Sequence, residues 1–318
     1  MQLPSLIEIE AAAAVIRAVM PPTPQYAWPL LAERAGCEVW VKHENHTPIG
    51  AFKVRGGLYY LHRLCAEQRK VTGLVSATRG NHGQSLALAC RARGVPVTIV
   101  VPHGNSQEKN ASMRALGATL IEHGEDFEAA RQYAGVLAAE HKLEIVPSFQ
   151  RDLVCGVATY ALELLRAVPR LKTVYVPIGL GTGICGLILV RDALGLDTEI
   201  VGVVAATAPA YALSFAAGKI VTTPTSATLA DGVACRIPDA DAFALIQRGA
   251  SRIVQVSEAN IAAAIGAYYT DTHQLAEGAG AIALAALLQE RELQRGARVA
   301  VILSGGNIDR DQYLGLMT

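Results

Sequence analysis

The sequence has no excess of charge of either sign. Its 318 residues include 28 Lys and Arg and 28 Asp and Glu, so the formal net charge is zero. No basic run is present either, and the chain therefore lacks the electrostatic pattern by which proteins bind nucleic acid or an anionic membrane surface. A small-molecule substrate is expected, and neither a nucleic acid nor a membrane partner.

Targeting signals and cysteine motifs are also missing. The first ten residues have no basic segment followed by an apolar core, so the sequence predicts no secretory signal. The six cysteines form no CxxC pair and show no spacing typical of metal ligands. Free thiols fit a reducing compartment, and we therefore expect a cytoplasmic protein.

Two stretches, 173–190 and 200–218, carry no charged residue over about the length of a membrane span. Glycines interrupt both of them, and the second also contains a proline, which favours buried strands, turns and helices over a span. With 51% hydrophobic and 18% charged residues, the composition is that of a globular protein with a large core.

Strand and helix patterns alternate along most of the chain. This alternation predicts an α/β fold with parallel sheets that are covered on both faces. The predicted strands are 39–42, 73–76, 95–101, 119–121, 174–178, 200–204 and 299–303, and the predicted helices are 7–19, 52–65, 83–93, 108–116, 127–140, 184–193, 261–267 and 281–288. Ligands bind beyond the carboxyl ends of such strands, so the loops after Ser76, Ile178 and Leu303 are the candidate sites.

The loop after Ile178 is rich in glycine and reads GLGTGICG over 179–186. Glycines allow several N–H groups to converge on one anion, and the following helix adds its positive end, which together predict a phosphate site. The alternative is a tight turn without a ligand. The spacing also satisfies GxGxxG, but the next predicted strand ends in Val-Val-Ala over 203–205, without the acidic residue that would bind a ribose. An NAD(P)-dependent dehydrogenase is therefore a weaker alternative.

Two further loops and one lysine carry polar chemistry. The loop 76–84 reads SATRGNHGQ and opens a helix, which favours a bound carboxylate, although a polar capping turn is the alternative. The loop 304–307 reads SGGN and offers a neutral hydroxyl. Lys53 has Phe52 and Val54 as neighbours, and an apolar setting would lower its pKa and make it a nucleophile toward an aldehyde. A solvated surface lysine is the alternative.

Together these segments resemble the fold-type II enzymes that use pyridoxal 5′-phosphate (PLP), in particular the serine/threonine dehydratase and serine racemase group. The matching segments are AFKVRG at 51–56, TRGNHGQ at 78–84, the glycine loop at 179–183, LADG at 229–232, EGAGA at 277–281 and SGGN at 304–307. The resemblance implies the tryptophan synthase β-like architecture. A large PLP-binding domain would consist of residues 1–69 and 146–318, and a small mobile domain of 70–145, with the cofactor between them. It also implies a homodimer.

The resemblance also implies roles for individual residues. Lys53 would bind PLP covalently and move the α-proton, while Phe52 would flank the cofactor. The cofactor's phosphate would be held by Gly179, Leu180, Gly181, Thr182 and Gly183, and its ring would be contacted by Asn81, Glu277 and Ser304. The substrate carboxylate would be bound by Thr78, Arg79, Gly80, Asn81 and His82. Because a neutral serine does not enforce a charged pyridine nitrogen, β-elimination fits better than transamination.

Two positions depart from the family pattern. Ala51 and Arg79 stand where relatives commonly have a small hydroxyl side chain or, at the second position, alanine. Arginine is a poor proton shuttle at neutral pH, which disfavours a racemase. Arg79 would instead bind a carboxylate, assist departure of a β-hydroxyl, or stack on a ring, and the alternative is a solvent-exposed side chain. The segment 204–210 lacks the carboxylates through which many relatives bind Mg²⁺ or Ca²⁺, so no metal is predicted there.

The resulting prediction is a PLP-dependent dehydratase that eliminates water from an L-β-hydroxy-α-amino acid and yields a 2-oxo acid and ammonia. The two departures favour a bulkier substrate than serine or threonine. L-threo-3-phenylserine is preferred, while 3-hydroxyaspartate and a hydroxyectoine-pathway intermediate stay open. The alternatives are a β-replacement enzyme similar to cysteine synthase, the NAD(P)-dependent dehydrogenase, and a binding protein without activity.

Overall fold

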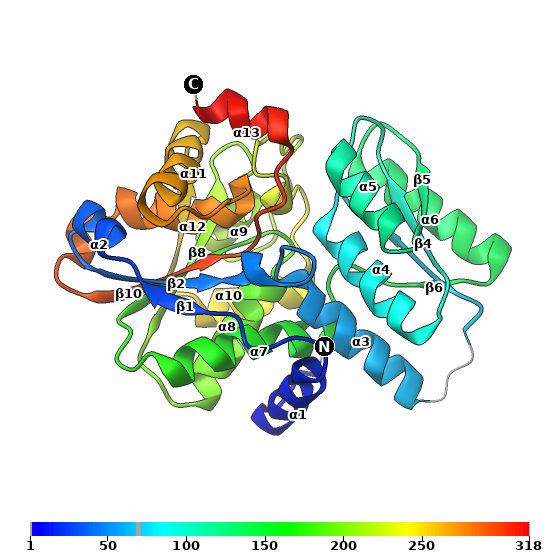
Figure 1. The fold of residues 1–318 in the computed structure, drawn as a ribbon, viewed down its shortest axis with the longest axis horizontal. Coiled ribbons are helices and arrows are strands. Elements are labelled where there is room, and N and C mark those ends of the chain that lie inside the picture. Colours follow the sequence, from blue (N-terminus) through cyan, green and yellow to red (C-terminus); the bar gives the residue numbers. More distant parts are fainter. Residues whose placement is uncertain (1, 68–70, 318) are drawn as a thin grey trace.

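Two sheets organise the chain in the computed structural model, which describes residues 2–67 and 71–317 (Figure 1). The first sheet has six strands in the order β1-β2-β10-β7-β8-β9, and the second has four in the order β5-β4-β3-β6. All strand pairs are parallel except β1 with β2. The strands are β1 Gln25–Ala27, β2 Glu38–His43, β3 Leu74–Ala77, β4 Val97–Val101, β5 Thr119–Glu122, β6 Glu144–Ile145, β7 Thr173–Pro177, β8 Glu199–Ala205, β9 Arg252–Val256 and β10 Arg298–Leu303. The α/β fold class predicted from the sequence is confirmed.

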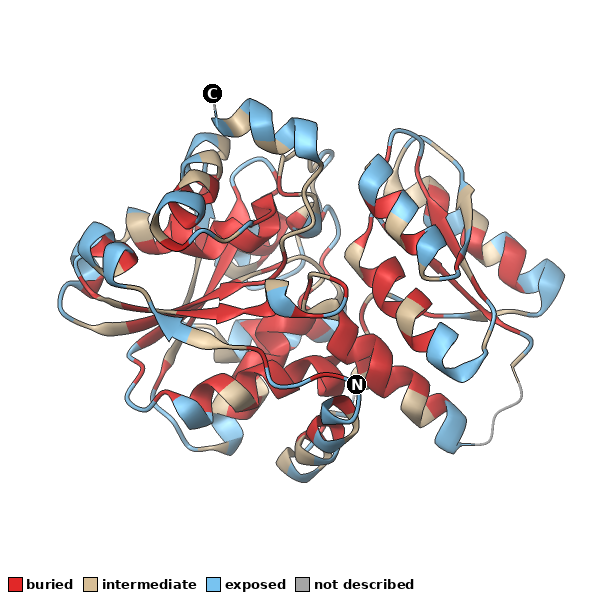
Figure 2. Ribbon diagram, in the orientation of Figure 1, coloured by how far each residue is buried: buried red, intermediate tan, exposed pale blue. Residues whose placement is uncertain are grey.

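Helices cover both faces of the six-stranded sheet. Side chains alternate along each strand, so Ala300 and Ile302 of β10 join one core while Val301 and Leu303 join the other. The first core contains helices α1 Leu6–Arg17, α7 Arg151–Ala167, α8 Thr182–Ala193 and α10 Ala240–Gly249. The second contains α2 Pro29–Ala35, α11 Glu258–Thr272 and α12 Gly278–Gln289. The buried layer is continuous across the sheet (Figure 2).

The four-stranded sheet is formed by residues between 74 and 145. The core on one face is its own, whereas the core on the other also includes side chains from 16–20 and 49–64. Helix α6 (Phe127–His141) covers one face, and α4 (Asn81–Arg93) covers the other with α5 (Gln107–Ala115) beside it. Helix α3 (Lys53–Ala66) packs against both α4 and α7 and so joins the two halves of the molecule (Figure 1). The predicted boundary near residues 69 and 70 lies outside the described residues, and the mobility of the smaller part remains a prediction.

The structure differs from the sequence prediction in several elements. Helix α7 was not predicted, although its apolar side chains gather on one face as in other helices and most of its residues are buried. The helix predicted from Ile184 begins at Thr182, so the end of the glycine loop forms its first turn. Strand β9 and helices α9 (Ala210–Ala217) and α13 (Arg310–Met317) were also not predicted.

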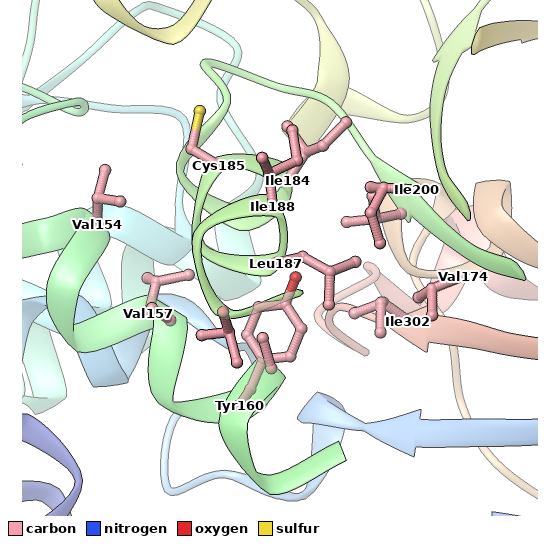
Figure 3. Close-up of a cluster of buried hydrophobic side chains, with 14 of the residues drawn as sticks. Val154, Val157, Tyr160, Val174, Ile184, Cys185, Leu187, Ile188, Ile200 and Ile302 are labelled. Atoms are coloured by element: carbon pink, nitrogen blue, oxygen red, sulfur yellow. The ribbon is translucent and has the colours of Figure 1, made fainter. Parts of the chain in front are cut away.

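Both uncharged stretches are accounted for by the folded core. Residues 173–190 form β7, the glycine loop and most of α8, and residues 200–218 form β8 and α9. Figure 3 shows side chains of α7 and α8 that pack against Val174, Ile200 and Ile302 of the sheet. Over residues 2–67 and 71–317, no helix is both long and apolar enough to cross a membrane.

Candidate active site

Lys53 is the first residue of α3, and its amine lies at the start of α8. Its Nζ donates a hydrogen bond to Oγ1 of Thr182 over 3.0 Å, and it lies 5.0 Å from the centroid of the Phe52 ring. Loss of hydration lowers the pKa of Lys53 to about 8. Since none of the described carboxylates forms an ion pair with this amine, a substantial fraction of it is neutral near pH 7.

The glycine loop between β7 and α8 is shaped by close backbone packing. A Cβ on Gly179 would lie 2.3 Å from the carbonyl oxygen of Gly232, so only glycine fits. Gly181 caps α8 with φ of 103°, a conformation that favours glycine. The first N–H groups of α8 have no partners within the helix and point out of its end, as an anion site requires.

Two buried tyrosines hold the carbonyl groups of this loop. The Tyr160 hydroxyl, which Figure 3 shows beside α8, donates to the carbonyl of Gly183 over 2.9 Å. The Tyr211 hydroxyl donates to the carbonyl of Leu180 over 3.1 Å. The tyrosine hydroxyls bond to the carbonyl oxygens of the loop and not to its N–H groups. The N–H groups therefore remain free to bind an anion.

A second polar group forms where β10 ends. The Ser304 hydroxyl donates to the carbonyl of Ala279 over 3.0 Å. The Asn81 amide donates to Oε1 of Glu277 over 2.7 Å and accepts from Nδ2 of Asn307 over 2.8 Å. The carbonyl oxygen of Asn81 keeps a second lone pair for a ligand hydroxyl. Burial raises the pKa of Glu277, although Lys109 opposes this.

Lys109 extends this group toward α5 and was missed by the sequence reasoning. Its Nζ lies 2.6 Å from Oδ2 of Asp231 and 3.3 Å from Oε2 of Glu277. Its methylene chain packs on Gly80, where an added Cβ would lie 2.4 Å from its Cδ. Lys109 therefore joins the substrate loop predicted at 78–82 to the predicted cofactor residue Glu277. No motif marks a lysine in the first turn of a helix as part of a site.

The side chains of the predicted substrate loop differ in what they contact. Oγ1 of Thr78 accepts a hydrogen bond from the N–H of Gly80 over 3.0 Å, which fixes the turn. Arg79 is exposed and makes no hydrogen bond or ion pair with any described residue. His82 is buried and lines a small cavity together with Lys53 and Ser148. The structure thus brings His82 and Lys53 together and leaves the Arg79 side chain apart from them.

These residues fit PLP. The cofactor needs an amine for its aldehyde, and Lys53 supplies one whose pKa is lowered. It needs donors for its phosphate, and the cradle at 179–183, which a Cβ on Gly179 would fill, offers the free end of α8. The chain contains groups of both kinds within reach of each other, since Lys53 already bonds to Thr182 of the cradle.

This combination of two parallel sheets, a partly desolvated lysine and a glycine-rich anion cradle defines the class of PLP-dependent enzymes of fold type II. The model of the "Pyridoxal-phosphate dependent enzyme" family matches residues 16–305, and the chain belongs to this family. The predicted dependence on PLP and the assignment to the PLP-dependent carbon–oxygen lyases are confirmed.

Several relatives resemble the chain over most of its length. An L-threonine ammonia-lyase of Thermotoga maritima is 34% identical over 283 residues, which are 88% of this chain and 70% of the relative. An L-threo-3-hydroxyaspartate ammonia-lyase of Pseudomonas sp. is 33% identical over 318 residues, which are 100% of this chain and 99% of the relative. The structure of maize serine racemase superposes with a TM-score of 0.92 at 28% identity, covering 99% of this chain and 97% of that one.

Proposed function

We propose that the protein is an ammonia-lyase that removes water from an L-β-hydroxy-α-amino acid, and that the residues predicted above form its site. The observation that carries this proposal is the placement of Lys53, with its lowered pKa, at the end of the glycine cradle. Two relatives that match most of this chain are named as ammonia-lyases, one of L-threonine and the other of L-threo-3-hydroxyaspartate. Loss of water would leave an enamine, which would then be hydrolysed by water to a 2-oxo acid and ammonia.

The chain's own groups supply the proton transfers. PLP, when bound, withdraws electrons from the α-carbon and makes its proton acidic. Lys53 Nζ takes that α-proton and delivers it to the oxygen of the departing β-hydroxyl, so the C–H and C–O bonds break and water leaves. When PLP is bound, the N–H groups of 179–183 would hold its phosphate, and Ser304 would offer its ring a neutral hydroxyl. Such a group does not enforce a positive charge on the ring, which favours prompt loss of the β-substituent.

Arg79 indicates the substrate class. Its guanidinium is exposed on the loop that is predicted to receive the substrate, and it has no acidic partner among the described residues. A second carboxylate on the β-carbon, as in 3-hydroxyaspartate, would supply that partner through charge-assisted hydrogen bonds. The relative that matches this chain from end to end bears the same substrate in its name.

Phenylserine is the second candidate. Leu153 and Val157 line the small space beside Lys53, so an apolar β-substituent would meet apolar side chains on that side. Arg79 could then stack on the face of the ring instead of binding a carboxylate.

The test is the release of 2-oxo acid from purified protein with PLP and a panel of substrates. The panel contains the threo and erythro forms of threonine, phenylserine and 3-hydroxyaspartate, together with L-serine. A Lys53→Ala protein serves as the blank and should release no product. Arg79→Gln should lower kcat/KM for 3-hydroxyaspartate by about 10- to 100-fold, the effect of losing a hydrogen bond to a charged group, and leave serine within about 2-fold.

Other outcomes assign other functions. Equal losses for serine and 3-hydroxyaspartate in Arg79→Gln would contradict the role of Arg79, and a loss largest for phenylserine would favour the second candidate. If no member of the panel yields 2-oxo acid while O-acetyl-L-serine and sulfide yield cysteine, the protein is a β-replacement enzyme.

A further inference from the structure

The ring of His82 is a buried polar group that the steps above do not use. His82 is the second residue of α4, and it is 5% exposed. The backbone of Val146 bonds to the ring, whereas its Nε2 has no partner among the described residues. The ring lines the same cavity as Lys53, Ser148 and Thr182. A buried acceptor without a donor is costly, so this atom points to a ligand.

The bond to Val146 determines which nitrogen carries the proton. A backbone carbonyl only accepts, so the ring nitrogen that bonds to it must be protonated, and the unpartnered Nε2 then carries a lone pair. Burial and the nearby Lys53 lower the pKa of His82 to about 3, so the ring is neutral. A neutral ring with a lone pair facing the cavity repels a carboxylate. The side-chain Nε2 of His82 is therefore unsuited to binding the carboxylate, whereas the backbone N–H groups at the start of α4 can still do so.

We propose that Nε2 of His82 accepts a hydrogen bond from the β-hydroxyl of the substrate and so positions the leaving group. The proposal rests on the proposed function. The substrate has three polar groups that could donate a hydrogen bond to Nε2. The carboxylate has no proton at neutral pH, and the amino group takes the place of the Lys53 amine. The β-hydroxyl is therefore the remaining donor. With its hydrogen held by His82, the hydroxyl oxygen keeps its lone pairs for the proton from Lys53 Nζ in the same cavity.

Two substitutions separate this role from simple packing. Asparagine at position 82 can keep the donor to the Val146 carbonyl but carries no acceptor at the place of Nε2. Glutamine is longer, and its amide oxygen can reach that place. Ser112→Ala is the matched control, since it removes a hydrogen bond to Gln84 on the same helix over 2.8 Å without altering the cavity.

The kinetic test compares two leaving groups on the loaded enzyme. The best β-hydroxy substrate loses water and donates a hydrogen bond, whereas 3-chloro-L-alanine loses chloride and has no hydroxyl to donate. His82→Asn should lower kcat for the hydroxy substrate by about 10- to 100-fold and leave that for 3-chloro-L-alanine within about 2-fold. His82→Gln should recover part of the loss, and Ser112→Ala should behave as the unmodified protein does with both substrates.

A second readout does not depend on activity. NMR of protein labelled with ¹⁵N-histidine should show His82 as a neutral ring with its proton on Nδ1 from pH 6 to 8. A proton on Nε2, or equal losses for both substrates in His82→Asn, would overturn the proposal and leave Nε2 as a site for water only. If the unmodified protein turns over 3-chloro-L-alanine but no hydroxy substrate, the proposed function fails, and this proposal fails with it.

Discussion

Replacing Lys109 by methionine tests whether the two parts of the molecule are held together by a buried charge. Lys109 on α5 contacts Asp231 and Glu277, which belong to the larger part, over 2.6 and 3.3 Å. The Lys109 side chain is 7% exposed and that of Glu277 is 3% exposed. Methionine keeps the length of the chain and its packing on Gly80 but removes the positive charge.

The expected loss of stability is large because Glu277 keeps its charge without its partner. Removing one member of a buried ion pair costs about 3–5 kcal/mol. The entropy of unfolding is about 2.1 cal mol⁻¹ K⁻¹ per residue, or about 0.7 kcal mol⁻¹ K⁻¹ for 318 residues. The melting temperature of Lys109→Met at pH 8 should therefore lie about 4–8 °C below that of the unmodified protein.

The loss should shrink in acid. Burial already raises the pKa of Glu277 in the folded protein, and Lys109 opposes this rise, so the pKa rises further when Lys109 is removed. A carboxyl whose folded pKa is raised binds a proton on folding, and its penalty is absent below the unfolded pKa of about 4.3. As the pH rises above this value, the loss of folding free energy due to Glu277 grows by at most about 1.4 kcal/mol per pH unit, until the pH passes the pKa of Glu277 in the folded protein.

The assay is thermal unfolding, followed by circular dichroism, of both proteins without PLP at pH 5, 6, 7 and 8. The difference in melting temperature should be smallest at pH 5 and rise by at most about 2 °C per unit. Lys109→Arg, which keeps the charge, should recover most of the loss. A difference that is the same at every pH, or that grows in acid, would refute the reasoning, since Glu277 would then not be the group left uncompensated.

Two further predictions concern PLP binding. Gly179→Ala should weaken PLP binding by more than about 10-fold, measured by absorbance titration, because the added methyl would lie 2.3 Å from the Gly232 carbonyl oxygen and displace the cradle; an unchanged affinity would show that the loop does not hold the phosphate. The rate of PLP capture should rise between pH 6 and 8 and then level off, because the pKa of Lys53 is about 8 and only the neutral amine reacts. At pH 7 about 10% of this amine is neutral, against about 0.03% for an ordinary lysine, and a rate still rising steeply at pH 10 would refute the lowered pKa.

The sequence predicted the positions of the loops after β3, β7 and β10 because their signals are local. Each of these loops follows an apolar strand and opens with glycine or a small polar residue, and parallel strands place such loops at one edge of their sheet. The burial of Lys53, in contrast, is not local, because Leu153, Val157 and Thr182 from other helices line the space around it.

The partners across the site could not be predicted in this way. Lys109 and Asp231 are 122 positions apart, and Asn81 and Glu277 are 196 apart, so no spacing pattern relates them. The free Nε2 of His82 is equally invisible in a sequence, because it depends on which backbone carbonyl meets the other ring nitrogen. Helix α7 supplies Tyr160, whose hydroxyl donates to the carbonyl of Gly183, and no pattern in the sequence relates these two residues.

The arginine of the lysine motif illustrates how the fold protects the chemistry of the site. Arg55 is two residues beyond Lys53, yet it is fully buried and contacts Glu44 over 2.7 Å and Glu163 over 2.8 Å. Lys42 completes the group through Glu163, also over 2.7 Å. Two positive and two negative charges in contact have no net charge, and their field falls off steeply with distance. This explains why burial alone, with no charged neighbour, accounts for the lowered pKa of Lys53. The motif arginine thus anchors α3 under the site without adding charge to the amine that reacts.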